Sequence, residues 1–192
     1  VGYTVNRFGN SLAMLWDDEG PHRLPTLSSE RPFAEAYRIN DSGQIAGKAA
    51  VAGGQSHAVY WDPMGIVDIG TLPGGANSFA MDINEAGVVA GSSEAEIGQS
   101  AFTWTKAGGL VDYGNTDPPF RLAAAGFNGL NNHGLLVGTT YILLSPYHAA
   151  LAREGHGGGV HISPPGRNSV GIALAVNEAR TMIRRTTAEI PM

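Results

Sequence analysis

Residues 80–91 read Ala-Met-Asp-Ile-Asn-Glu-Ala-Gly-Val-Val-Ala-Gly, which is an apolar segment, a polar turn and a second apolar segment. An asparagine and a nearby glycine between two apolar runs are typical of a β-hairpin. Similar stretches lie around Asn40, Asn131 and Asn177, although the last has Arg180 where the turn glycine is expected. The chain is therefore built on a repeated hairpin.

The repeat has a regular length. Glycines of the second apolar segment recur at intervals of 44 to 47 residues, at Gly2, Gly47, Gly91 and Gly138. A unit of this length matches the four strands of one propeller blade. We predict a single all-β domain over residues 1–192, a small β-propeller of four to five blades. The predicted repeats are about 1–40, 41–84, 85–131 and 132–177, with a partial repeat at 178–192.

The strands at the two ends of the chain are predicted to close the ring, in one of two ways. The fourth strand of the last repeat, residues 172–177, could complete the opening blade and leave residues 181–187 as a surplus strand. Alternatively, the terminal strands form a partial fifth blade beside a three-stranded first blade. An unpaired terminal strand at a ring edge would also favour pairing between two copies of the chain, and hence a homo-oligomer.

Composition excludes several classes of protein. Only 15% of the residues are charged, and 27 glycines and 11 prolines suit short strands joined by tight turns. A net charge of −5 without a run of Lys or Arg argues against nucleic-acid binding. With no cysteine, there is no disulfide, zinc–thiolate site or cysteine nucleophile. The longest apolar run, residues 134–144, is too short to insert across a membrane.

Three segments of the second repeat carry a resemblance. They are Ile-Asn-Asp-Ser-Gly-Gln-Ile-Ala-Gly at 39–47, Ser-His-Ala-Val-Tyr-Trp at 56–61 and Val-Asp-Ile-Gly-Thr-Leu-Pro-Gly-Gly at 67–75. They resemble the bacterial HAF repeat, named for the His-Ala-Phe at the head of its second strand. The other repeats depart from it, with Ser100 and Leu12 at the position of His57. The resemblance implies a propeller-like fold and an extracellular or periplasmic protein whose leader is absent from this sequence, and it assigns no chemistry.

The turn asparagines allow two interpretations. An asparagine at this place commonly starts a turn, with its side chain bonded to the backbone two residues on. If the strand before the turn is innermost, the same side chains would instead form a ring of oxygens at one mouth of the channel, which suits Ca²⁺. Asp82 lies on the same strand face as Asn84 and would add charge. The predicted metal ligands are Asn40, Asp82, Asn84, Asn131 and Asn177.

The fourth repeat concentrates histidines. His148, His156 and His161 lie within fourteen residues, together with Glu154. Such a group can bind a transition metal or supply a general base, and we predict these histidines as the catalytic residues. His148 and His156 nevertheless fall at opposite ends of one predicted strand, and a histidine in a glycine-rich hairpin is commonly just solvated. No substrate-binding residue is assigned.

Two functions from different classes follow. The preferred hypothesis is a hydrolase in which Ca²⁺ near the propeller axis helps to open a lactone or small ester. It resembles the calcium-dependent propeller lactonases in fold and residue type only, because their motifs are absent. The alternative is a non-catalytic extracellular binding or scaffold module, in which the loops after the third strands contact a polysaccharide or a protein. The expected partner is accordingly a small lactone or ester, or a glycan.

Overall fold

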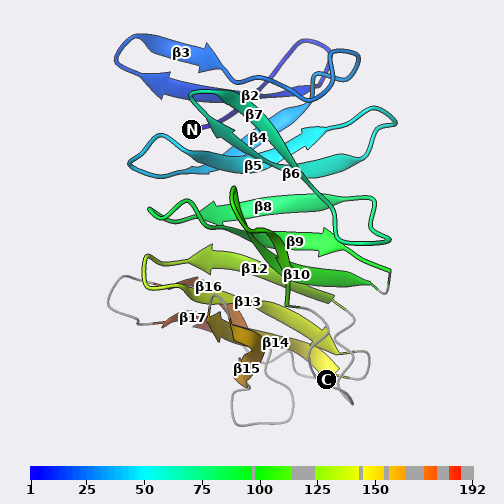
Figure 1. Cartoon of the computed structure of the whole chain (residues 1–192), viewed down its shortest axis with the longest axis vertical. Coiled ribbons are helices and arrows are strands. Elements are labelled where there is room, and N and C mark those ends of the chain that lie inside the picture. Colours follow the sequence, from blue (N-terminus) through cyan, green and yellow to red (C-terminus); the bar gives the residue numbers. More distant parts are fainter. Residues whose placement is uncertain are drawn as a thin grey trace.

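The computed structural model describes residues 1–96, 98–113, 124–142, 145–153, 156–162, 171–176 and 182–186. Side chains are described in residues 1–96, 98–113 and 126–139. All regular secondary structure in the described residues is β-strand (Figure 1). The part of the chain that is described contains no helix that could cross a membrane. The predicted all-β class is confirmed.

The strands form antiparallel sheets, which we call blades 1 to 4, and a terminal hairpin. Blade 1 has three strands and blade 2 has four: β1 (Gly2–Val5), β2 (Ser11–Asp17), β3 (Gly20–Arg23); β4 (Ala34–Ile39), β5 (Ile45–Ala50), β6 (Ser56–Asp62), β7 (Gly65–Gly70). Blades 3 and 4 each have four strands: β8 (Ser78–Ile83), β9 (Val89–Glu94), β10 (Gln99–Thr105), β11 (Gly109–Asp112); β12 (Ala124–Leu130), β13 (Leu135–Ile142), β14 (Ser145–Arg153), β15 (His156–Ile162). The terminal hairpin is β16 (Gly171–Val176) and β17 (Met182–Thr186).

Each complete blade begins with the strand that precedes the asparagine turn. In blade 2 the order of pairing is β4, β5, β6, β7, and blade 3 repeats it with β8, β9, β10, β11. A single parallel bridge between Gln99 and Ala124 links blade 3 to blade 4. We call β4, β8 and β12 the inner strands, because each leads its blade and contacts strands of the blade before it. The predicted four-stranded repeat is confirmed.

The blades follow one another along the long axis in chain order (Figure 1). Blade 1 lies at the top of this view, and the β16–β17 hairpin lies beside blade 4 in the lower part. β16 pairs with β17 and contacts β12, β13 and β14, so the hairpin continues the array instead of completing blade 1. Within the residues that the structure describes, the ring closure predicted from the terminal strands is not shown. Of the two predicted arrangements, the pairing of β16 with β17 agrees better with a three-stranded first blade and a partial fifth blade.

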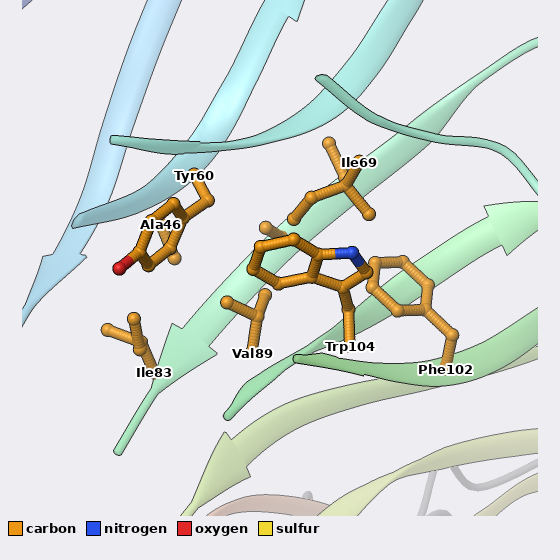
Figure 2. Close-up of a cluster of buried hydrophobic side chains, with 9 residues drawn as sticks. Ala46, Tyr60, Ile69, Ile83, Val89, Phe102 and Trp104 are labelled. Atoms are coloured by element: carbon orange, nitrogen blue, oxygen red, sulfur yellow. The ribbon is translucent and has the colours of Figure 1, made fainter. Parts of the chain in front are cut away.

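Apolar side chains fill the spaces between successive blades. Between blades 2 and 3, the rings of Tyr60 and Trp104 lie 5.2 Å apart at 49° (Figure 2). Ile83 and Val89 pack in the same cluster. Burying such aromatic and aliphatic surface is the main stabilising contribution at these interfaces.

The tryptophans near the ends of β2, β6 and β10 occupy equivalent places in their blades but differ in their exposure to solvent. Trp61 is 1% exposed and Trp104 is 7% exposed, and each belongs to the cluster between its own blade and the preceding one. Trp16, at the same place in blade 1, is 50% exposed. Two of these three tryptophans therefore pack between blades.

The repeated glycines have a packing role in β5, β9 and β13, the strands that pair with the inner strands. The inner strand carries a β-bulge opposite the glycine in blades 2, 3 and 4. The bulge presses a carbonyl oxygen of the inner strand onto the glycine Cα, so that an added Cβ would overlap the oxygen. The pairs of glycine and carbonyl are Gly47 with Glu35, Gly91 with Phe79, and Gly138 with Gly126.

Candidate functional site

Three of the predicted metal-binding asparagines close the turns of their hairpins. Asn40, Asn84 and Asn131 follow β4, β8 and β12 and are buried. The Oδ1 atom of each accepts a hydrogen bond from the backbone N–H four residues on, at 2.9 Å in Asn40 and 3.0 Å in Asn84 and Asn131. The turn interpretation of these residues accordingly agrees with their geometry. Asn177 lies outside the described residues.

The amide nitrogens of the same side chains reach the next blade. Asn40 Nδ2 donates to the carbonyl oxygen of Asn84 at 2.9 Å, and Asn84 Nδ2 donates to that of Asn131 at 3.2 Å. Neighbouring turn residues add a second row, in which the N–H of Asp41 donates to the Glu85 carboxylate at 3.1 Å. One end of the array is thus held together by a ladder of hydrogen bonds between blades. The calcium site stays a prediction. It would use asparagine oxygens that already accept hydrogen bonds from backbone N–H groups.

Asp82 also connects two blades. Its Oδ2 accepts a hydrogen bond from the N–H of Leu130 at 2.7 Å, and its Oδ1 accepts one from Ile83 at 3.0 Å. Arg38 of blade 2 places its Nε 3.7 Å from Oδ1. Burial raises the pKa of Asp82, although the two backbone hydrogen bonds and Arg38 act in the opposite direction. Among the described residues no group of three His, Asp or Glu side chains is arranged to hold a metal ion.

The register of β14 and β15 separates the predicted catalytic histidines. His148 and His161 lie near the same end of the strand pair, since Ala149 is opposite Ile162 and Ala150 is opposite His161. His156 is opposite Arg153 at the other end. At about 3.3 Å per residue, His156 and His161 are roughly 16 Å apart along β15. The three therefore do not meet at one point, and their side chains are outside the described set.

Blade 2 contains a histidine–aspartate pair that the sequence did not reveal. His57 Nδ1 lies 3.0 Å from both carboxylate oxygens of Asp68, on adjacent strands β6 and β7. The N–H of Gly70 also donates to Asp68 Oδ1 at 2.8 Å. The equivalent register positions in blade 4 are those of His148 and His161, so the aspartate of the pair is not repeated there.

Two hollows lie at the end of the blades opposite the asparagine turns. Each forms where the connection leading to an inner strand meets a hairpin of the same blade, that of β5 and β6 in blade 2 and that of β9 and β10 in blade 3. The first, of about 410 Å³, is lined by Asn10, Glu30, Arg31, Pro32, Phe33, Ala50, Gly54 and Ser56. The second, of about 470 Å³, is lined by Gly74, Ala76, Glu94, Ala95, Gly98 and Gln99. They occupy equivalent places in blades 2 and 3.

The charged groups in the two hollows differ in what they bind. Glu94 accepts hydrogen bonds from the N–H groups of Ala76 and Asn77 and from Asn77 Nδ2, and these bonds lower its pKa. The Glu94 carboxylate is therefore already bound to the connection that leads to β8. Arg31 is exposed, and its guanidinium makes no ion pair or hydrogen bond within the described part of the chain. The first hollow thus offers a free guanidinium.

A network of charged and aromatic groups lies next to the first hollow and shares Phe33 with it. Lys48 Nζ is 3.2 Å from Glu35 and 5.3 Å from the centres of the Phe33 and Phe79 rings. Tyr37 donates its hydroxyl to Glu35 at 2.7 Å. Burial works against ionisation of Glu35, but hydrogen bonds from Tyr37, Ser11 and Lys48 outweigh it and lower the pKa. This network fixes the position of Phe33 at the hollow.

Comparison with solved structures places the fold among the propellers. The chain is similar to the crystal structure of selenomethionine-substituted virginiamycin B lyase from Staphylococcus aureus, with a TM-score of 0.56 and 14% sequence identity. The match covers 94% of this chain and 60% of the lyase chain, so this chain spans three fifths of the length of the lyase. Identity at this level shows the fold alone.

Neither a family model nor a curated protein matches the chain. The resemblance to the HAF repeat accordingly rests on the residues of the second repeat that carry it.

Proposed function

We propose that this protein is a non-catalytic binding module outside the cytoplasm, which binds a polysaccharide in the first hollow. The observation that carries the proposal is the guanidinium of Arg31, which has no partner among the described residues, in a hollow of about 410 Å³ that Phe33 also lines. The hollow is bordered by the connection after the third strand of blade 1. If the protein is a binding module, the sequence predicts that loops of this type contact its ligand.

The lining of the hollow suits sugar hydroxyl groups. Asn10, Glu30 and Arg31 supply planar polar groups, and Ser56 supplies a hydroxyl. The half-buried ring of Phe33 offers an apolar face for the C–H side of a sugar. A few convergent polar groups around an apolar surface are the usual composition of a small-molecule site. The resemblance to an extracellular repeat supports a setting in which polysaccharides are accessible.

Substitution at Arg31 tests this proposal. On a glycan array we expect saturable binding to a limited set of polysaccharides, and Arg31→Ala is expected to weaken it about tenfold because a charge-assisted hydrogen bond is lost. Arg23→Ala is the matched control, since Arg23 is also exposed but lies on β3 away from the hollow. An equal loss in both variants would show a general charge effect, and no saturable binding to any glycan would contradict the proposal.

The second candidate function is the calcium-assisted opening of a lactone or small ester. The observation in its favour is Asp82, a carboxylate that is only 16% exposed and lies on the inner strand next to the turn of Asn84. The likeness of fold to a lyase is compatible with an enzyme, and fold does not establish the reaction. In this hypothesis the histidines of blade 4 would move the proton.

Calcium separates the two candidates. We expect that calcium leaves the melting temperature unchanged, because Asp82 and the turn asparagines already accept hydrogen bonds from backbone N–H groups. Differential scanning calorimetry with calcium and with a chelator measures this directly. A rise in melting temperature that the chelator abolishes, together with turnover of a lactone, would instead favour the hydrolase.

A further inference from the structure

The backbone that carries Arg31 is held by hydrogen bonds on both sides. The N–H of Arg31 donates to the hydroxyl of the buried Ser28 at 3.3 Å, and its carbonyl oxygen accepts from the N–H of Phe33 at 2.7 Å. The carbonyl oxygen of Phe33 accepts from the N–H of Ala50 on β5 at 2.9 Å. Pro32 also restricts the residue before it to extended conformations. The guanidinium therefore starts from a backbone that is already fixed, which lowers the entropic cost of binding a ligand.

The turn between β5 and β6 leaves room for the guanidinium of Arg31. A Cβ added at Gly54 would lie 2.9 Å from Nη1 and 3.4 Å from Cζ of Arg31, so the guanidinium lies directly against the glycine. The φ of Gly54 is +93°, a conformation that residues with a side chain rarely adopt. Because the guanidinium has no hydrogen bond or ion pair within the described residues, its donors are available to a ligand.

Glu30 gives the first hollow a second charged group. Glu30 and Arg31 both line the hollow, but their side chains form no ion pair with each other. In the part of the chain that is described, Glu30 also makes no ion pair with any other basic group. A hollow with one available guanidinium and one available carboxylate suits a ligand that carries both an anionic group and hydroxyl donors.

The second hollow differs from the first in its charge. It occupies the equivalent place in blade 3, and the described residues that line it include Glu94 and no Lys, Arg or His. An anionic group there would meet a like charge without a cation to bind it. We therefore expect an anionic ligand in the first hollow alone, at one site per chain.

We propose that the first hollow binds an acidic polysaccharide whose sugar units carry carboxylates, that is, a polymer of uronic acids. This inference rests on the proposed function and names the class of polysaccharide. The planar guanidinium of Arg31 matches the two oxygens of a carboxylate and donates two parallel hydrogen bonds to them. The hydroxyl groups of the same sugar donate to Glu30 and to the side-chain oxygen of Asn10, which also lines the hollow.

The charges also distinguish this class from other polysaccharides. A neutral sugar offers Arg31 only hydroxyl oxygens, and hydrogen bonds between a charged donor and a charged acceptor are stronger. A densely sulfated polymer would bring several negative charges close to Glu30, while Arg31 pairs with only one of them. One carboxylate among free hydroxyl groups is the ligand that satisfies both side chains.

Matched sugar oligomers test the proposal by isothermal titration calorimetry. The ligands are short oligomers of galacturonic, mannuronic and glucuronic acid, each compared with the same oligomer after its carboxyl groups have been reduced to alcohols. We expect at least one acidic oligomer to bind about tenfold or more tightly than its reduced form, at one site per chain. Added salt should remove most of this difference, because the ion pair is exposed to solvent.

Variants of the protein complete the test. Arg31→Ala should weaken the acidic oligomer about tenfold, to the level of its reduced form, and Arg31→Lys should restore the salt dependence without the full affinity. Glu30→Gln should tighten the acidic oligomer a few-fold and leave the reduced one unchanged, because a like charge is removed from the hollow. Arg23→Ala, which lies away from the hollow, should change neither.

The outcomes separate this inference from the proposed function on which it rests. Equal binding of acidic and reduced oligomers, both weakened by Arg31→Ala, would leave the polysaccharide proposal intact and overturn the acidic class. Tighter binding of a sulfated oligomer than of every uronic acid oligomer would overturn the preference for carboxylates. No saturable binding to any acidic or neutral glycan would overturn both proposals.

Discussion

Replacing Gly91 with alanine is expected to reduce the free energy of unfolding by about 3 kcal/mol or more, or to prevent folding. The added Cβ would overlap the backbone carbonyl oxygen of Phe79 and lie 3.0 Å from the Phe102 ring. Neither can move away cheaply, because Phe79 belongs to the inner strand and Phe102 is fully buried between blades. Denaturation in urea, followed by tryptophan fluorescence, measures the change.

Gly2→Ala is the matched control for this prediction. The residue and the change are the same, and Gly2 holds the equivalent position in β1, where no inner strand approaches. We expect its free energy of unfolding to change by less than about 1 kcal/mol, because an exposed tryptophan ring can shift. Equal losses in the two variants would show that the loss does not come from the close approach of the inner strand to Gly91. An unchanged Gly91→Ala protein would contradict the close approach itself.

The repeat was the part of the fold that sequence could predict. Regular spacing of asparagine and glycine indicates a hairpin in each unit, because both residue types have local reasons to be there. The arrangement of the blades relative to one another has no such local signal. It depends on how side chains such as Tyr60 and Trp104 pack across an interface. The predicted ring closure is not shown by the described residues, and it depends on an angle between blades that composition and spacing do not encode.

The candidate site was less predictable than the fold. Asn84 was recognised as a turn residue, but the bond from its Nδ2 to Asn131 depends on the distance between two blades. Arg31 was missed because it lies in an irregular connection whose sequence differs from one repeat to the next. Its importance comes from what surrounds it, namely a hollow and no acidic partner within the described residues. Such an environment is a property of the folded chain.

Replacing Asn84 with alanine is expected to cost about 2 to 4 kcal/mol of stability, because two buried partners lose a hydrogen bond at once. The N–H of Val88 loses the Oδ1 acceptor, and the carbonyl oxygen of Asn131 in the next blade loses the Nδ2 donor. Asn6→Ala serves as the control. The Oδ1 of Asn6 caps its own turn in the same manner, by accepting from Phe8 and Asn10, and its expected cost is about 1 kcal/mol.

Asn84→Asp separates the two hydrogen bonds of Asn84. The aspartate keeps an acceptor for Val88, but when ionised it has no donor for the Asn131 carbonyl, which lies 3.2 Å from Nδ2 in the native protein. The folded protein therefore favours the protonated carboxyl, so we expect its pKa to rise above the unfolded value. A carboxyl group whose pKa is higher in the folded state destabilises the fold fully at pH values above that pKa. This loss of stability disappears as the pH falls below the pKa of the carboxyl in the unfolded state, which is about 4. Urea midpoints measured from pH 4 to 8 should thus approach the wild-type values at the acidic end. A deficit that is the same at every pH would show that the bond between blades contributes nothing, and that Asn84 acts through its turn alone.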